Sequence, residues 1–391
     1  MALFVPNPEA ESVEEIIEEL SLTLARTYRD AEDTLIREVA ARAIRDMRLA
    51  SQLDTADARA RNRLLAELAA YRATAARELQ GEAVALVERL RRSGLAERII
   101  EIAAREGEAA AVAQMGLAAT HGAVTGTASQ ATAMVALNLQ SRLEILNQRI
   151  TRYPQDAYQR IIALYSPQTI LGVTTSRQQQ AAAVQRFLAE GIPAFTDRAG
   201  RRWTIGAYAE MAGRTSVNRA YNDAGVWRQQ QSGLNLVTVV RGLDSCRKCA
   251  AWAGKILSTD GTPAGPVILP HQTEDRSVAV QVDGTVEGAR ASGWGHPNCR
   301  CRLVPYMPGL TIPQADTTYD EAAEKERAEQ RSLEREIRAA KRREASAMTD
   351  TDRARAARDV RDAQHDMREF IARTGRKRQS YREQLHFADG R

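Results

Sequence analysis

The chain has 391 residues, a net charge of +5 on a background of 55 basic and 50 acidic side chains, and a pI of about 9.1. This balance permits contact with nucleic acid but does not require it. Aromatic residues make up only 5% of the chain and hydrophobic residues 43%, which favours helices with thin interfaces over a dense β-sandwich or barrel.

Residues 8–105 predict long amphipathic helices. Apolar side chains recur at helical spacing from the start, at Val13, Ile16, Ile17, Leu20 and Leu24. Ser12, followed three residues later by Glu15, has the form of a capping box at a helix start. A second helix is expected over residues 64–90, ending at Ser93 and Gly94, and no proline interrupts residues 9–153.

The following stretch, residues 109–141, contains no charged side chain. It is long enough to span a bilayer and contains Gly122-x-x-x-Gly126, but it is poor in leucine and isoleucine. We therefore expect a helix buried in a bundle, with His121 as a partly buried polar residue. Shorter helices, interrupted by Pro154, Pro167 and Pro193, are expected over residues 142–195.

Residues 203–228 predict a further helix, and residues 236–240 a strand rich in valine. Arg214 and Arg219 on that helix could bind phosphate or carboxylate, but a solvated position is the commoner case. A long loop over residues 258–292 is rich in glycine and proline. Its alternating valines, Val278, Val280 and Val282, predict a hairpin strand.

All four cysteines of the chain lie within one stretch, as a Cys-x-x-Cys pair and a Cys-x-Cys pair. These are Cys246 and Cys249 after the predicted strand, and Cys299 and Cys301, with His296 just before the second pair. Zinc takes four sulfur or nitrogen ligands in a tetrahedron, often as two close pairs joined by the fold. The spacing predicts a structural zinc site, but five candidates for four places leave the ligand set open.

Two alternatives to a structural metal fit the same residues. The first is a set of buried thiols or disulfides. Because the N-terminal segment is acidic and does not have the form of a signal peptide, we expect a reducing compartment, which disfavours disulfides. The second is a metal-dependent nuclease site of His-Asn-His type, built from His271, His296, Asp275 and Asn298. A full set of protein ligands leaves no open position for water, and no nucleotide-binding or hydrolase motif occurs, so we expect a protein that is not an enzyme.

The C-terminal region, from about residue 320, is charged and helical in pattern, with many acidic and basic pairs three and four residues apart. Its apolar residues are sparse, so we expect an exposed arm or a partner helix without an intramolecular core. It ends in a basic patch formed by Arg373, Arg376, Lys377 and Arg378. This patch predicts either a DNA-binding accessory role or a solvated tail.

Residues 195–309 resemble the phage minor capsid protein 2 family, a relative of the Mu F-like head morphogenesis proteins of tailed phages. The residues that carry the resemblance form an ordered set: Asp197, Gly200, Arg201, Trp203, Arg214, Thr215, Cys246, Cys249, the HPNCRC segment of residues 296–301, Pro305, Tyr306, Pro308 and Gly309. The resemblance covers about the middle third of the chain. The helices before it fit more loosely, and the C-terminal region adds nothing to it.

The resemblance implies a structural minor capsid protein of the virion, inside the head and near the portal, acting in assembly and in the packaging or ejection of DNA. The implied partners are the portal protein, the major capsid protein or both, with packaged DNA as a further candidate. The implied location is the capsid interior, after assembly in the host cytoplasm. Contact with a membrane is not expected.

The predicted fold is mainly α with a small α+β module stapled by cysteine and histidine. We divide the chain into a long-helix N-terminal region at residues 1–150 and a helical family core at residues 151–235. A Cys/His module with short strands follows at residues 236–310, and a charged helical arm at residues 311–391.

Overall fold

The computed structural model describes residues 12–116, 126–171, 187–196, 202–242, 245–314, 319–347 and 349–385, together with Val184 and Gly200. The chain divides by its contacts into two compact units. Unit 1 comprises Met1–Ala25, Gly94–Arg142 and Ala209–Arg327, and unit 2 comprises Arg26–Ser93, Leu143–Tyr208 and Ala328–Arg391. The division into four segments made from the sequence stays a prediction.

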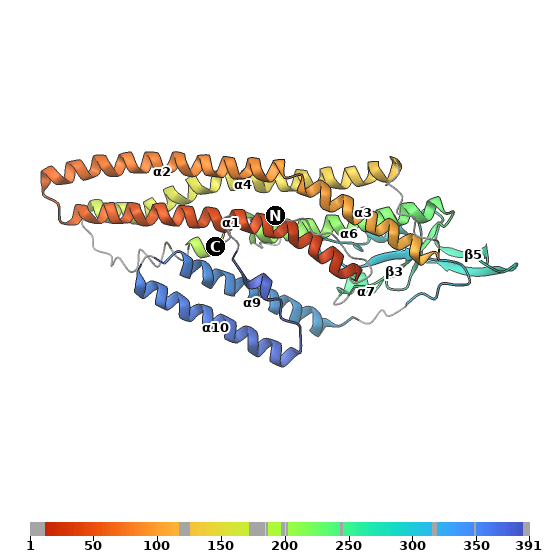
Figure 1. Cartoon of the computed structure of the whole chain (residues 1–391). Coiled ribbons are helices and arrows are strands. Elements are labelled where there is room, and N and C mark those ends of the chain that lie inside the picture. Colours follow the sequence, from red (N-terminus) through yellow and green to blue (C-terminus); the bar gives the residue numbers. More distant parts are fainter. Residues whose placement is uncertain are drawn as a thin grey trace. The chain divides into compact units, whose positions relative to one another are not determined.

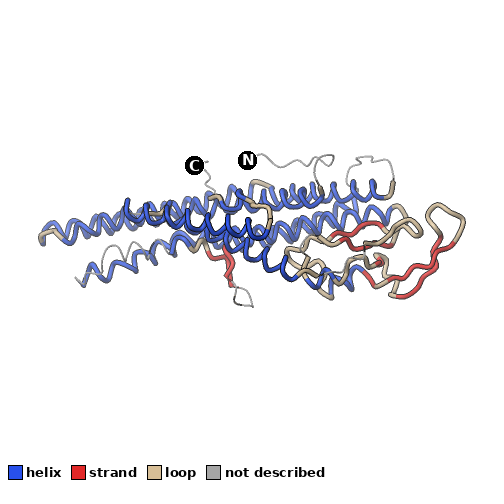
Figure 2. Tube along the Cα trace, turned by 90° about the horizontal axis from the view of Figure 1, so that it is seen from below, coloured by secondary structure: helices blue, strands red, loops and turns tan. Residues whose placement is uncertain are grey.

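Long helices dominate the described residues, and the strands are short (Figure 2). The longer helices, labelled in Figure 1, are α1 (Val13–Ser51), α2 (Ala58–Arg92), α3 (Leu95–Gln114), α4 (Gly126–Leu171), α6 (Ile205–Gln231), α9 (Glu321–Ala345) and α10 (Asp350–Thr374). The short helical elements are η1 (Gln52–Asp54), α7 (Arg247–Ala250), α8 (Val286–Ala291) and η2 (Ser380–Glu383). The predicted class, mainly α with a small strand-containing module, is confirmed.

The ends of the first helices follow the capping rules that the sequence indicated. At the start of α1, the Ser12 backbone N–H donates to Glu15 Oε2 at 2.8 Å, and the Glu15 N–H donates to Ser12 Oγ at 3.3 Å. This reciprocal pair is the predicted capping box. The Asp57 side chain caps α2, and α2 ends at the predicted boundary, where Gly94 has a φ of 57°.

The predicted interruption of residues 142–195 by prolines is wrong at two positions, because Pro154 and Pro167 both lie inside the continuous helix α4. A proline within a helix removes one backbone hydrogen bond and costs roughly 3 kcal/mol. Burial of neighbouring side chains such as Tyr158 and Ile161 offsets the loss at Pro154.

The expectation of a buried helix over residues 109–141 is also wrong in part. On α4, Met134 is 66% exposed and Leu137 is 56% exposed. His121 and Gly122 lie outside the described residues. Within the part of the chain that the structure describes, no helix combines the length and the apolar character needed to cross a membrane.

Unit 1 contains a four-stranded sheet with the order β7–β4–β3–β8. Its strands are β3 (Leu236–Val240), β4 (Ile256–Ser258), β7 (Gly284–Thr285) and β8 (Arg302–Pro305). The central strand β3 is the predicted valine-rich strand, and it pairs antiparallel with both β4 and β8. The predicted hairpin also forms, from β5 (Gly265–Pro270) and β6 (Ser277–Val282).

Two glycines allow α3 and α6 to cross with their backbones almost touching in unit 1. A Cβ atom added at Gly107 would lie 2.1 Å from the carbonyl oxygen of Tyr221, and one at Gly225 would lie 3.1 Å from that of Gly107. Real Cβ atoms do not approach a backbone oxygen as closely as the first of these distances. The crossing therefore requires the absence of a side chain at Gly107.

In unit 2, the described C-terminal residues form two helices that pack together, so the expectation that this region lacks an intramolecular core is wrong. Ile337 of α9 packs with Met367 and Phe370 of α10, and all three side chains are at most 3% exposed. The few apolar residues of this charged region fall on the facing sides of the two helices. The unit also contains the two-stranded hairpin of β1 (Pro193–Thr196) and β2 (Arg202–Thr204).

A buried ion cluster fixes α9 to α1 within unit 2. Arg342 Nε lies 2.8 Å from Asp33 Oδ1, and Arg342 Nη2 lies 3.6 Å from Glu32 Oε2. Glu32 also accepts hydrogen bonds from the backbone N–H groups of Ile192 and Gly206. Burial raises the pKa of Glu32, because desolvation disfavours its charged form. Arg342 therefore compensates two acids that have little access to water.

We expect Gly107→Ala to destabilise unit 1, because the added methyl group must push α3 and α6 apart. The cost of such overpacking is about 1–3 kcal/mol, visible as a lower thermal midpoint by circular dichroism. Gly81→Ala in α2 is the matched control. No atom lies within 4 Å of a Cβ added there, so higher helix propensity should leave the midpoint unchanged or raise it. Equal midpoints for both variants would contradict the described crossing.

We expect Arg342→Met to cost roughly 3–5 kcal/mol at pH 7, because it leaves two buried acids without their cation. The folded-state pKa of Glu32 is raised above its ordinary value of 4.5. The folded state therefore binds a proton at Glu32 more tightly than the unfolded state does. The loss of stability in Arg342→Met should shrink as the pH falls from 7 toward 4.5. Urea unfolding at several pH values measures this.

Arg343→Met is the control on the same helix. Arg343 lies 3.3 Å from Asp359 at the surface, and exposed pairs contribute less than about 1 kcal/mol. A deficit for Arg342→Met that is small, or that does not depend on pH, would contradict the role assigned to the buried cluster.

Candidate metal centre

The structure brings all five predicted ligand residues into one cluster in unit 1. Cys246 precedes the short helix α7, Cys249 lies within it, and His296, Cys299 and Cys301 lie in the loop before β8. The ligand atoms of Cys246, Cys249 and His296 lie within 4.8 Å of one another, as do those of Cys249, Cys299 and Cys301. Cys249 belongs to both groups and is therefore the centre of the cluster.

The separations between ligand atoms are those of a metal site rather than of disulfides. Cys249 Sγ and Cys299 Sγ are 3.5 Å apart, and all four cysteines are free thiols. Two sulfurs each bound to one tetrahedral zinc lie about 3.8 Å apart, whereas a disulfide bond is about 2.05 Å long. The separation thus fits two sulfurs that share an ion.

The imidazole of His296 is oriented as a ligand. Its Nδ1 lies 2.7 Å from the carbonyl oxygen of Pro297, and its Nε2 lies 2.9 Å from Cys246 Sγ. A carbonyl can only accept, so Nδ1 carries a proton, and in a neutral imidazole Nε2 then has the lone pair that can bind a metal. Histidines that bind metals are commonly held in this way, with one ring nitrogen donating to a carbonyl and the other facing the ion.

The contacts between the sulfurs shift the pKa values of the thiols in opposite directions. Hydrogen bonds from Cys249 and Cys301 lower the pKa of the Cys299 thiol well below its usual range. The same contact with Cys299 raises the pKa of Cys249, and burial adds to this increase. The opposite directions of the two shifts have one cause, the close contact between the two sulfurs. A divalent ion would allow further thiols to ionise.

Polar side chains on one face of α6 hold the loop that supplies three of the ligands. Thr215 Oγ1 accepts a hydrogen bond from the Asn298 N–H at 3.1 Å. Asn218 and Asn222 donate to the carbonyl oxygen of Cys301 at 3.2 and 3.3 Å, and Asn222 Oδ1 accepts from the Leu303 N–H. Asn218 and Asn222 are not among the residues predicted from the sequence, and Thr215 appears there only as part of the family resemblance. The spacing of these residues, three and four apart on one face of a helix, was the available signal.

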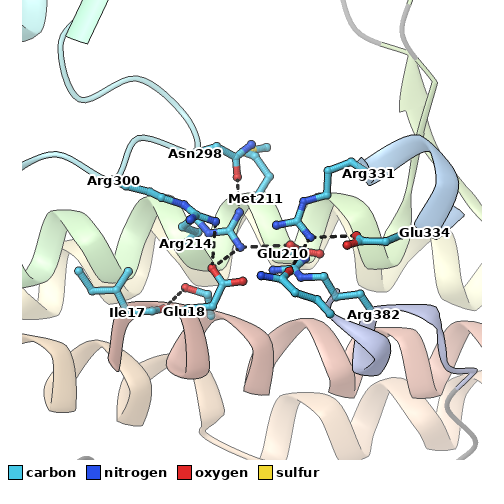
Figure 3. A network of polar contacts seen from close by, with 12 residues as sticks. Ile17, Glu18, Glu210, Met211, Arg214, Asn298, Arg300, Arg331, Glu334 and Arg382 are labelled. Atoms are coloured by element: carbon cyan, nitrogen blue, oxygen red, sulfur yellow. Dashed lines mark hydrogen bonds and ion pairs between the residues drawn. The ribbon is translucent and has the colours of Figure 1, made fainter. Parts of the chain in front are cut away.

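Arg214 belongs to the same face of α6, and its expected solvated position is wrong. The residue is 5% exposed, and its guanidinium donates to Glu18 at 2.7 Å, Glu210 at 3.2 Å and Asn298 Oδ1 at 3.3 Å (Figure 3). Two carboxylates around one guanidinium provide the compensation that a buried arginine needs. Arg219, by contrast, is exposed and pairs with Asp223.

The residues of the alternative nuclease site lie in different surroundings. The Nδ1 atom of His271 accepts hydrogen bonds from the backbone N–H groups of Thr273 and Glu274, and the imidazole is buried. These contacts fix the turn between β5 and β6, so they favour a structural role over that of a general base. Asn298 is bound to α6, and Asp275 is exposed in the same turn as His271.

The predicted basic patch lies in unit 2, where three of its four side chains have partners. Arg373 lies 2.7 Å from Glu329, Arg376 donates to Gln330 Oε1, and Arg378 lies 2.6 Å from Glu383. Lys377 contributes its carbonyl oxygen to a hydrogen bond from Gln330. DNA contact through these four residues stays a prediction, and phosphates would have to compete with the acidic partners of Arg373 and Arg378.

A family model described as phage minor capsid protein 2 matches residues 14–372. The match confirms the family resemblance and extends far beyond residues 195–309, so the expected coverage of about the middle third of the chain, with nothing added by the C-terminal region, is too narrow. It includes the long N-terminal helices and nearly all of α9 and α10. Neither the comparison with curated proteins nor that with solved structures gave a match.

Asn298 offers a test of the loop geometry, because it adopts a φ of 66°. Asparagine tolerates this left-handed conformation better than other residues with a Cβ, and glycine tolerates it best. Asn298→Gly and Asn298→Ala both lose the hydrogen bond from Arg214. We expect the alanine variant to be less stable than the glycine variant by about 1 kcal/mol, measured by thermal unfolding. Equal stability would show that the loop does not hold this conformation.

Proposed function

Because the chain belongs to the phage minor capsid protein 2 family, we propose that it acts inside the head of a tailed phage, near the portal. The family assignment makes it a structural phage protein and a component of the virion. Within that role, we assign it to head assembly through contacts with the portal protein, the major capsid protein or both, and to the packaging or ejection of DNA. The observation that carries this proposal is the match over residues 14–372.

The character of the candidate site agrees with a structural role rather than an enzymatic one. The five ligand residues supply sulfur and nitrogen donors only, and four of them are enough to fill a tetrahedral zinc shell. A filled shell leaves no position at which water could be activated. The proposed role of this centre is therefore mechanical: it links the loop before β8 to α7.

The proposed metal is zinc, held by four of the residues Cys246, Cys249, His296, Cys299 and Cys301. The donor set fits zinc, since thiolate and imidazole ligands in close pairs are typical of structural zinc sites. An ion bound only by the folded protein stabilises it by the free energy of binding. It would fix both ends of the long segment between Cys249 and His296, which contains β4–β7 and α8.

Elemental analysis of the purified protein tests the metal, with one zinc per chain expected. In single variants of the five ligand residues, with cysteine changed to serine and histidine to alanine, zinc should be lost in the four that bind it. The fifth variant should retain zinc and thereby identify the residue outside the shell. His365→Ala, on α10, is the control and should retain a full equivalent. Absence of zinc from the wild-type protein, or full retention in all five variants, would refute the centre.

The head assignment has its own test. When virions are separated into heads and tails, we expect the protein in the head fraction, and cross-linking of intact heads should link it to the portal or the major capsid protein. Recovery with tails, or absence from virions, would contradict the proposed location.

A further inference from the structure

The segment that ends in β8 has two faces, and only one of them points at the candidate metal centre. Cys299, Cys301 and Leu303 are all buried in the core of the small module, with Val237 and Val239 of β3. Successive side chains of an extended segment point to opposite faces. The residues between them, Arg300 and Arg302, therefore project away from that core.

The two arginines on the outer face meet two acids at the start of α1. Arg300 Nη2 lies 3.4 Å from Glu18 Oε2, and Arg302 Nη2 lies 2.6 Å from Glu14 Oε1. In Figure 3, dashed lines join the carboxylate of Glu18 to the guanidinium groups of Arg300 and Arg214. All of these residues belong to unit 1.

The spacing of the two acids along α1 matches the spacing of the two arginines along the extended segment. Glu14 and Glu18 are four residues apart on α1, which corresponds to about 6 Å along a helix. Arg300 and Arg302 are two residues apart on an extended segment, which corresponds to about 6.6 Å. The pairs can therefore form side by side only when the segment has one particular register. A slip of one residue would turn the arginines into the core and the cysteines away from the metal centre.

The candidate metal centre and the start of α1 thus contact opposite faces of one segment. Both sets of contacts require the same register of that segment. We propose that Glu14 and Glu18 are positioning residues for the metal centre, and that binding of zinc and docking of residues 13–24 of α1 strengthen each other. The coupling rests on the proposed zinc site. Linkage requires it to be reciprocal: whatever factor the docked helix adds to zinc affinity, zinc adds to the docking equilibrium.

Burial supports a coupling larger than an ordinary surface ion pair would give. The side chain of Arg214 is 6% exposed and that of Glu18 is 18% exposed. Glu18 is the shared acceptor of Arg214 and Arg300, so its loss removes one of the two carboxylates around the buried Arg214 guanidinium and, at the same time, the ion pair with Arg300. Such a loss disturbs the segment that carries Cys299 and Cys301, because Arg300 lies between them.

Zinc competition with a chromophoric chelator tests the proposal on full-length protein. We expect Glu18→Gln, and more strongly Glu14→Gln combined with Glu18→Gln, to raise the zinc dissociation constant by roughly 10-fold or more, as is typical when residues supporting metal ligands are changed. Glu15→Gln is the matched control. It removes the same charge from the same helical turn, but Glu15 binds Ser12, and glutamine can replace it in a capping box. Its zinc affinity should equal that of the wild type.

Hydrogen exchange of the wild-type protein gives the reciprocal measurement and needs no variant. Removing zinc with a chelator should speed exchange at the amides of residues 16–24, whereas the amides of α10 should exchange at unchanged rates. If the wild-type chain binds no zinc, the proposed metal centre fails. If it binds one zinc but the acidic variants bind as tightly as the Glu15→Gln control and exchange in α1 is indifferent to zinc, the coupling alone is refuted.

Discussion

One extended segment, residues 299–303, connects the main interactions of unit 1. Its two-residue period places thiols in the core of the small module and two guanidinium groups against α1, and the amide of Asn298, just before it, contacts Arg214 of α6. The hydrogen bonds from Asn218 and Asn222 hold the backbone between these faces. A segment contacted on both faces cannot shift to satisfy one set of contacts without losing the other. This constraint explains why the thiols converge even though fifty residues separate the two pairs.

In both units, buried charged side chains fix how helices pack together, as large apolar side chains do in many other proteins. Aromatic residues are few, and several helices meet through alanine, glycine and ion pairs. Arg214 in unit 1 and Arg342 in unit 2 are each nearly inaccessible, and each contacts two carboxylates. Such clusters add little net stability relative to apolar packing, but a partial cluster is costly. They therefore favour one arrangement of helices over others with similar hydrophobic contact.

Much of this structure could be read from local sequence patterns. The Ser12–Glu15 cap, the strand β3 and the hairpin of β5 and β6 all follow from rules that act over a few residues, and the structure has each of them. The clustering of the four cysteines in space was also predictable, because zinc ligands usually occur in the sequence as two close pairs. Which four of the five donors would bind an ion could not be predicted, because all five lie within reach and their spacing does not rank them.

The errors arose where distant contacts override local preference. Pro154 breaks an isolated helix, but in α4 its neighbours are buried, so the helix continues. The apolar residues of α9 and α10 looked too sparse for a core, yet they fall on facing sides of two helices whose pairing the sequence does not specify. Arg214 looked like an ordinary surface residue, because its partner Glu18 is far away in the sequence.

X-ray absorption at the zinc edge of the purified protein tests most directly the central claim that the cysteines and His296 hold a zinc ion. The account predicts one zinc per chain, with a four-coordinate shell of sulfur at about 2.3 Å and at most one nitrogen at about 2.0 Å; a shell dominated by oxygen, or no zinc at all, would contradict it.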